Sequence, residues 1–170
     1  MTELTLVDPV RSIDGADLEI RPLRPADRRA YECAVGRLSP RTRELRFGGR
    51  RGPLTEAEIA HFLDVGHDGR EALAVWSPEE GTIVAIGRIE PTVGGAELAL
   101  VVDDRWQGRG VGSVLIDRLI EQAVGLGYHD LVATTDYENV VASRLLHHHG
   151  FRTTGVAWGV IELSRPIAAA

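Results

Sequence analysis

Lysine is missing from this sequence, and cysteine, aromatic residues and long apolar runs are scarce. All 19 basic residues of the 170-residue chain are arginine. The absence of lysine excludes a Walker A phosphate loop, which needs a Gly-Lys pair. Cys33 is the single cysteine, so the chain forms no internal disulfide and no cysteine-based metal cluster, in agreement with a reducing compartment. We expect Cys33 to lie in the core.

No apolar run approaches the roughly 20 residues that a membrane helix needs, and residues 1–11 lack the apolar region of a signal peptide. We therefore expect a cytoplasmic protein with no membrane partner. The net charge of -6 opposes binding to nucleic acid, which depends on clustered positive charge. Hydrophobic residues make up 44% and charged residues 26%, which is typical of a globular protein. We expect a single domain over residues 1–170, with its core between about 17 and 165.

Alternating apolar residues and helical spacing divide the chain into a succession of strands and helices. Strands are predicted over residues 17–23, 71–76, 82–89, 97–102, 131–135, 151–156 and 158–163. Helices are predicted over residues 26–38, 40–47, 55–66, 110–126 and 139–149. This order predicts an α+β fold, with a central mixed sheet and helices on both faces.

The segment with the strongest chemical signal is the glycine-rich Gln107-Gly108-Arg109-Gly110-Val111-Gly112, between a strand and a helix. Glycines let backbone N–H groups approach an anion, and the start of a helix adds its positive dipole end, so the segment suits a pyrophosphate. The alternative is a tight turn with close helix packing. The segment departs from the dinucleotide fingerprint, because its third glycine comes one residue too soon.

These residues resemble the GNAT family of N-acetyltransferases, whose signature is Gln/Arg-x-x-Gly-x-Gly/Ala after a strand. Here the signature residues are Gln107, Gly110 and Gly112. A second element of the family matches downstream at Asn139, Ala142, Leu145, Gly150 and Phe151. The resemblance covers nearly the whole chain, and it implies a GNAT-like sheet and acetyl-CoA as cosubstrate.

The resemblance also implies positions for the cofactor. The backbone of Leu100, Val101 and Val102 would pair with the pantetheine arm, and Asn139 would bond it near the thioester. The pyrophosphate would lie over Gln107, Gly108, Arg109, Gly110, Val111, Gly112 and Ser113. Ser143 and Arg144 would reach the far end of the cofactor, unless they form a solvated helix face.

Between Arg21 and Val75 the sequence resembles the acetyltransferase domain of bacterial protein lysine acetyltransferases, through RLSPRTRELRF, LTEAEIAHFLDV and REALAV. This resemblance implies a protein lysine as acceptor. A small-molecule amine and a noncatalytic acyl-CoA-binding sensor are the alternatives, and both a monomer and a homodimer are open.

Glu97 is the candidate general base. An alkylammonium has a pKa near 10.4, and only the neutral amine attacks a thioester. Glu97 interrupts an apolar strand, and alternation places it on one face with Ala99 and Val101. The lysine acetyltransferases carry a glutamate on this strand. The alternative is a surface carboxylate at the start of a strand.

Expulsion of the CoA thiolate is often assisted in the family by a tyrosine acid, whose position is Leu146 here. A thiolate with a pKa of roughly 8.5, by analogy with cysteine, leaves without a strong acid. Water or Tyr137 would then suffice, and a structural role for Tyr137 is the alternative.

Four further sets of side chains carry a less specific signal. Consecutive helix positions point about 100° apart, so His147, His148 and His149 are expected to form a solvated helix end rather than a metal site. His61 and His67 are expected to be structural. Arginines concentrate before Gly52, either to recognise an acidic substrate surface or a phosphate, or as a solvated helix face. They are Arg37, Arg41, Arg43, Arg46, Arg50 and Arg51. Trp106 either shields the cofactor or packs in the interior.

Overall fold

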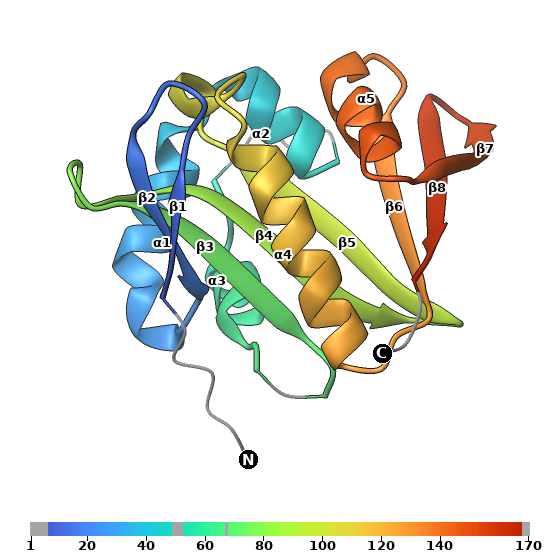
Figure 1. The fold of residues 1–170 in the computed structure, drawn as a ribbon, viewed down its shortest axis with the longest axis horizontal. Coiled ribbons are helices and arrows are strands. Elements are labelled where there is room, and N and C mark those ends of the chain that lie inside the picture. The colour runs from blue at the N-terminus through green and yellow to red at the C-terminus, as the bar shows by residue number, and fades with distance from the viewer. Residues whose placement is uncertain (1–6, 49–52, 67, 168–170) are drawn as a thin grey trace.

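The computed structural model describes residues 7–48, 53–66 and 68–167, which form one sheet with helices packed on it (Figure 1). The strands are β1 (Asp8–Arg11), β2 (Asp17–Pro22), β3 (Glu71–Ser77), β4 (Thr82–Thr92), β5 (Gly95–Val102), β6 (Asp130–Asp136), β7 (Arg152–Ala157) and β8 (Val160–Pro166). The α-helices are α1 (Arg28–Arg37), α2 (Pro40–Arg46), α3 (Glu56–Leu63), α4 (Val111–Gly125) and α5 (Val140–His148). Two short 3-10 helices are η1 (Pro25–Asp27) and η2 (Asp104–Trp106). The predicted α+β class is confirmed.

The sheet has the strand order β1-β2-β3-β4-β5-β6-β8-β7, and neighbours are antiparallel except β5 and β6. β4 pairs with β5 as far as Val102, and β6 pairs with β8 from Asp130 to Asp136. In contrast, β5 and β6 are paired only at Ala96–Leu131 and Glu97–Val132. The two parallel strands therefore part beyond Glu97, in the middle of an otherwise continuous sheet.

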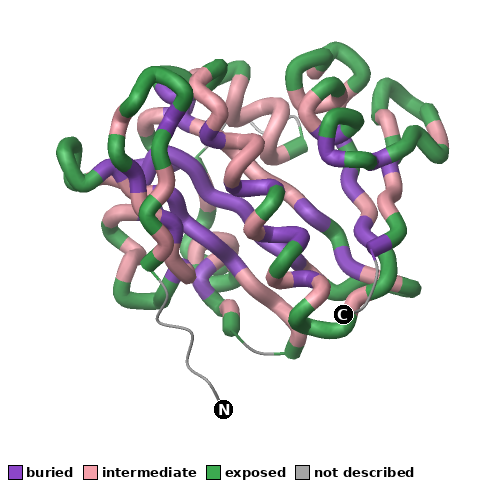
Figure 2. The backbone as a smooth tube through the Cα atoms, viewed as in Figure 1, coloured by how far each residue is buried: buried purple, intermediate pink, exposed green. Residues whose placement is uncertain are grey.

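Helices cover both faces of the sheet, and each face has its own hydrophobic core (Figures 1 and 2). α4 packs on one face through Leu115, Ile116 and Leu119, none of which is exposed to solvent. α1 and α3 pack on the other face, where Tyr31 and Leu63 are buried. Along β5, Leu98 and Leu100 belong to the α4 side and Val101 to the side of α1 and α3, as strand alternation requires.

The predicted helices and strands are all present, with some differences in their bounds. The strand predicted from Glu97 begins at Gly95, and β4 continues to Thr92, because the pairs Pro91–Ala96 and Thr92–Gly95 extend this hairpin. The capping box of Thr55 and Glu58 is formed as predicted. β1 was not predicted, since four residues that include a proline give too short an alternation; such a strand suits the sheet edge that it occupies.

The prediction that Cys33 lies in the core is wrong. Cys33 is exposed, because the buried residues of this helical segment are Tyr31, Ala34, Val35 and Leu38. The expected stripe of Ala30, Cys33, Ala34 and Leu38 also has helical spacing, but the observed one includes the larger side chains of Tyr31 and Val35. Their burial removes more apolar surface from water.

Candidate active site

The parting of β5 and β6 opens one edge of β5 in the centre of the molecule. Leu100, Val101 and Val102 pair with Gly87, Ile86 and Ala85 of β4 on one side, and no strand of the described chain pairs with their other side. Backbone N–H and C=O groups on such an edge can bond an extended ligand as they would another strand. The three residues predicted to meet the pantetheine arm therefore lie where an extended chain can pair with them.

The glycine-rich turn connects this edge to the start of α4. Gly108 and Gly110 have φ of 72° and 80°, a conformation that favours glycine. A Cβ at Gly108 would meet no atom within 4 Å, whereas one at Gly112 would lie 3.1 Å from Leu145 and 3.5 Å from Val102. Gly110 is the N-cap of α4 and offers no side chain to the N–H groups of the first turn. The turn is thus open at Gly108 and closely packed at Gly112, as an anion site at a helix start requires.

The side chains of Gln107 and Arg109 form contacts within the protein and stabilise the turn. The amide of Gln107 donates to the Val102 carbonyl oxygen at 3.0 Å. The guanidinium of Arg109 stacks on the Trp106 ring at 3.8 Å and pairs with Asp14 at 2.6 Å. Trp106 is 3% exposed and belongs to the hydrophobic core. Of the two roles considered for it, packing in the interior is therefore the one observed.

A hydrogen-bonded array lies behind the turn, where α4 meets the end of α5. Ser113 Oγ lies 2.7 Å from His149 Nε2, and His149 Nδ1 lies 2.9 Å from Asp117 Oδ1. The prediction of a solvated helix end fits the exposed His147 and His148 but is wrong for His149, whose side chain is 6% exposed. Helix α5 turns its last residues toward α4, and this tertiary contact across 36 positions leaves no local signal in the sequence.

The start of α5 carries the second sequence element of the predicted site. The Asn139 side-chain oxygen accepts from the Ala142 N–H at 3.1 Å and caps the helix, so its amide nitrogen is the part left to bond a ligand. The Ser143 hydroxyl lies 3.4 Å from His147 Nδ1. Arg144 is exposed on the same helix.

Glu97 lies at the last residue pair of β5 and β6, where the strands part. It is exposed, and no hydrogen bond or ion pair holds its carboxylate within the described parts of the chain. Its charge acts on Arg46 of α2, which places it within electrostatic reach of that guanidinium. Glu97 is therefore a free carboxylate beside the open edge of β5.

A pocket with buried charges lies on the same face of the sheet, between Tyr31, Arg46, Phe47, Phe62, Arg88 and Val101. Burial lowers the pKa of Arg46, and Arg88 lowers it further, whereas Tyr31, Glu97 and Glu90 raise it. Arg88 forms an ion pair with Glu90, yet burial still lowers its pKa. Burial raises the pKa of Tyr31 to about 12, so its hydroxyl keeps its proton at neutral pH.

Arg88 and Glu90 were missed at the sequence level, although a signal for Arg88 was present. Arg88 interrupts the apolar run of β4 as Glu97 interrupts that of β5, and its side chain is 6% exposed. A charge in such a strand is rarely buried without a partner or a function. Its Nε has no hydrogen-bond partner among the described residues.

The predicted arginine cluster divides into different roles. Arg37 bonds Asp103 at 3.1 Å and the Ile83 carbonyl, and Arg43 bonds the carbonyl oxygens at the end of α1. Arg41 pairs with Glu138, between β6 and α5, at 2.9 Å. Arg46 alone of the described four lines the charged pocket, while Arg50, Arg51 and also His67 lie outside the described residues. His61 lies 3.4 Å from Glu90 at the same face.

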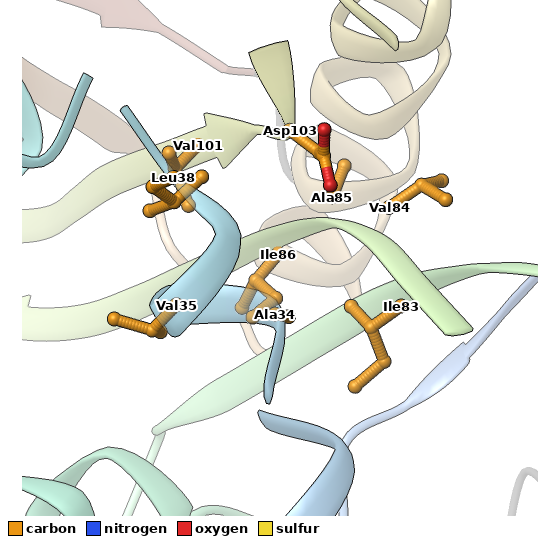
Figure 3. Close-up of a pocket in the computed structure, with 9 residues that line it drawn as sticks. All are labelled: Ala34, Val35, Leu38, Ile83, Val84, Ala85, Ile86, Val101 and Asp103. Carbon is orange, nitrogen blue, oxygen red and sulfur yellow. The ribbon is translucent and has the colours of Figure 1, made fainter. Parts of the chain in front are cut away.

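A second, apolar cavity adjoins this pocket, and Val35, Ile86 and Val101 line both (Figure 3). Asp103 is its polar lining residue, and its carboxylate is held by Arg37 and Arg105. Although burial alone would raise the pKa of Asp103, these hydrogen bonds lower it. The cavity thus continues the pocket beneath α1 with apolar surface.

Neither side chain considered as an acid for the leaving thiolate lies in a catalytic arrangement. Leu146 is 4% exposed and packs in the core with Phe151. The side chain of Tyr137 is 64% exposed, so it has no packing role in the interior. Within the described residues, no group of three or more metal-binding side chains occurs, and no helix is long and apolar enough to span a membrane.

The two parallel strands that part, the open edge of β5 and the glycine turn that begins α4 are together suited to an extended ligand with an anionic group. Comparison with known proteins gives the family. Residues 40–151 match the acetyltransferase (GNAT) family, and the chain belongs to this family. It is an acyltransferase with acetyl-CoA as cosubstrate.

Individual relatives agree with this assignment. The chain is 31% identical over 130 residues to the Pseudomonas aeruginosa acetyltransferase PA5475, covering 74% of this chain and 70% of that protein. The crystal structure of the GNAT domain of Streptomyces lividans PAT superposes with a TM-score of 0.89 at 22% identity, covering 98% and 100% of the two chains. A phosphinothricin acetyltransferase from Sinorhizobium meliloti in complex with acetyl-CoA superposes with a TM-score of 0.66 at 19% identity, covering 88% of each chain.

Proposed function

We propose that this protein transfers the acetyl group of acetyl-CoA directly to a primary amine, with Glu97 as the general base. The observation that carries the proposal is the position of Glu97, an unpaired carboxylate at the point where β5 and β6 part. A base there stands at the end of the open edge on which the pantetheine arm would lie. The sensor alternative has no use for this carboxylate.

The cofactor would be held mainly by the backbone. The free edge at Leu100, Val101 and Val102 would pair with the pantetheine arm, and the N–H groups at the start of α4 would bind the pyrophosphate over Gly108 and Gly110. The open space at Gly108 fits this role, since a side chain is absent where the phosphates need room. Acetyl-CoA supplies an acetyl group activated as a thioester.

Acetyl transfer requires removal of a proton from the ammonium and addition of a proton to the leaving thiolate. Glu97 would take the ammonium proton and leave the neutral amine that attacks. Leu146 lies in the core and carries no acidic group, so solvent would supply the proton to the thiolate. The exposed Tyr137 would not be required.

The acceptor would bind on the side of α1, α2 and α3. The pocket beside Glu97 holds a guanidinium, Arg46, for which no hydrogen bond or ion pair is seen in the described chain. An acceptor with both charges would match it, its anionic group on Arg46 and its ammonium toward Glu97. This favours a small zwitterionic amine, and the phosphinothricin acetyltransferase among the similar structures acts on a small molecule. A protein lysine remains the prediction from the sequence resemblance.

The decisive experiment incubates the protein with acetyl-CoA and each class of acceptor, following thiol release and acceptor mass. We expect stoichiometric thiol release and a gain of one acetyl group on an amino acid-like amine. A lysine-containing peptide acetylated in preference to the small amines would reverse the choice of acceptor. Tight acetyl-CoA binding without transfer to any amine would favour the sensor.

A further inference from the structure

The array of Ser113, His149 and Asp117 lies against the first turn of α4, the part of the fold proposed to hold the pyrophosphate. Ser113 and Asp117 are four residues apart on α4 and so share one face of the helix. His149, at the end of α5, is bonded to both, at 2.7 Å from Ser113 and 2.9 Å from Asp117. An ordered imidazole thus lies one hydrogen bond away from a hydroxyl at the cofactor site.

The count of donors and acceptors in this array depends on what occupies the turn. The carboxylate of Asp117 accepts, so His149 Nδ1 carries a hydrogen. In a neutral imidazole, Nε2 is then an acceptor and takes the hydrogen of the Ser113 hydroxyl. Ionised pyrophosphate oxygens only accept, so the hydroxyl must turn its hydrogen toward them. Ser113 Oγ can then keep its bond to His149 only if Nε2 donates.

We propose that binding of the cofactor's pyrophosphate is coupled to protonation of His149, which orients the Ser113 hydroxyl and places a positive charge behind it. The inference rests on the proposed position of the cofactor. The proton comes from solvent and forms the Nε2–H bond, and no other covalent bond changes. His149 is a positioning residue, because it acts on the cofactor through Ser113.

The charges around His149 are consistent with this role. Asp117 of α4 stabilises an imidazolium, whereas Arg165 of β8, which donates to the His149 carbonyl oxygen at 2.7 Å, opposes it. The His148 ring lies edge-on with its centroid 5.4 Å away. Arg109, the cation within the turn itself, is occupied by Asp14 and Trp106. Protonation of His149 would therefore add one positive charge behind the turn, beside that of Arg109.

Calorimetry in two buffers with different ionisation enthalpies tests the proposal, because the difference in heat counts the protons taken up. Dephospho-CoA is the suitable probe, since it lacks the 3′-phosphate, a monoester that would itself titrate near about pH 6. The full chain is compared with Ser113→Ala, His149→Gln and, as a control on the adjacent exposed residue, His148→Gln. Measurements run from about pH 6 to pH 8.

We expect the parent and His148→Gln to take up a net fraction of a proton, approaching one, and to lose up to about tenfold in affinity per pH unit over part of this range. Ser113→Ala and His149→Gln should show neither effect. Equal proton uptake in the parent and in Ser113→Ala would overturn the inference, and Ser113→Ala keeps this test available if His149→Gln does not fold. Failure of the parent to bind either CoA or dephospho-CoA would overturn the cofactor position as well.

Discussion

The two faces of the sheet are built from different kinds of residue. The α4 side is formed by glycines, exposed backbone groups and a closely packed apolar core. The side of α1, α2 and α3 includes long charged side chains inside its core, with Arg88 buried and Arg46 beside it. Backbone recognition suits a cofactor of constant shape, whereas side chains suit an acceptor of particular charge and shape. In the proposed function, the α4 side would therefore bind acetyl-CoA, and the side of α1, α2 and α3 would select the acceptor.

Glu97 lies on the side of α1, α2 and α3, at the point where β5 and β6 part, and its replacement should have the largest effect. Glu97→Gln keeps the shape and removes the base, so turnover at neutral pH should fall roughly 10²- to 10⁴-fold. The Kd for acetyl-CoA should barely change. The variant should regain part of its activity as the pH rises toward the amine's pKa, because neutral amine then forms without a base. Steady-state rates across this pH range provide the measurement.

Glu90 provides the matched control for this change. It is a carboxylate on the neighbouring strand, opposite Glu97 in the register, but it is paired with Arg88. Glu90→Gln should affect acceptor binding more than the pH profile. A folded Glu97→Gln protein that turns over at the parent rate at every pH would remove Glu97 from the mechanism.

A charge placed on the turn should break the cofactor side alone. Gly108→Asp puts a carboxylate into the open space of the turn, and we expect the affinity for acetyl-CoA to fall about 100-fold by repulsion of the pyrophosphate. Gly108→Asn is the control, because asparagine tolerates the positive φ equally and carries no charge. Calorimetric titration of both variants gives the comparison. Equal affinities for the two would exclude a pyrophosphate at Gly108.

The sequence predicted the geometry of the glycine-rich turn much better than that of the charged pocket, for physical reasons. Gly108, Gly110 and Gly112 lie within five residues of one turn. Their spacing can therefore be recognised in a short stretch of the sequence. Glu97 was found because it breaks an apolar alternation. The contact of His149 with Ser113 depends on how two helices meet, and the pairing of Arg88 with Glu90 on how a core closes around them. Such tertiary contacts have no period in the sequence.

Loss of the unpaired guanidinium should affect the acceptor side alone. Arg46→Gln should raise the KM of an anionic acceptor about 10- to 150-fold, since a hydrogen bond to a charged group contributes about 1.5–3 kcal/mol. The Kd for acetyl-CoA should be unchanged. Arg29→Gln, on the exposed side of α1, is the control for loss of one positive charge. Steady-state kinetics are measured with a zwitterionic amine and with its ester, which lacks the anionic group. Only the KM of the zwitterion should respond to Arg46→Gln.

Restoring the family's tyrosine should have the smallest effect. Leu146 lies in the core of the α4 side, 4% exposed, so Leu146→Tyr must fit a larger ring and a hydroxyl into close-packed surroundings. We expect a loss of about 1–3 kcal/mol in the free energy of unfolding. A thiolate already leaves readily near neutral pH, so an added acid should raise kcat at most a few-fold. Leu146→Phe adds the same ring without the hydroxyl, and chemical denaturation and kcat are measured on both. If Leu146→Tyr exceeded Leu146→Phe tenfold or more in kcat, protonation of the thiolate would limit the parent enzyme. The α4 side would then contribute to catalysis as well as to binding.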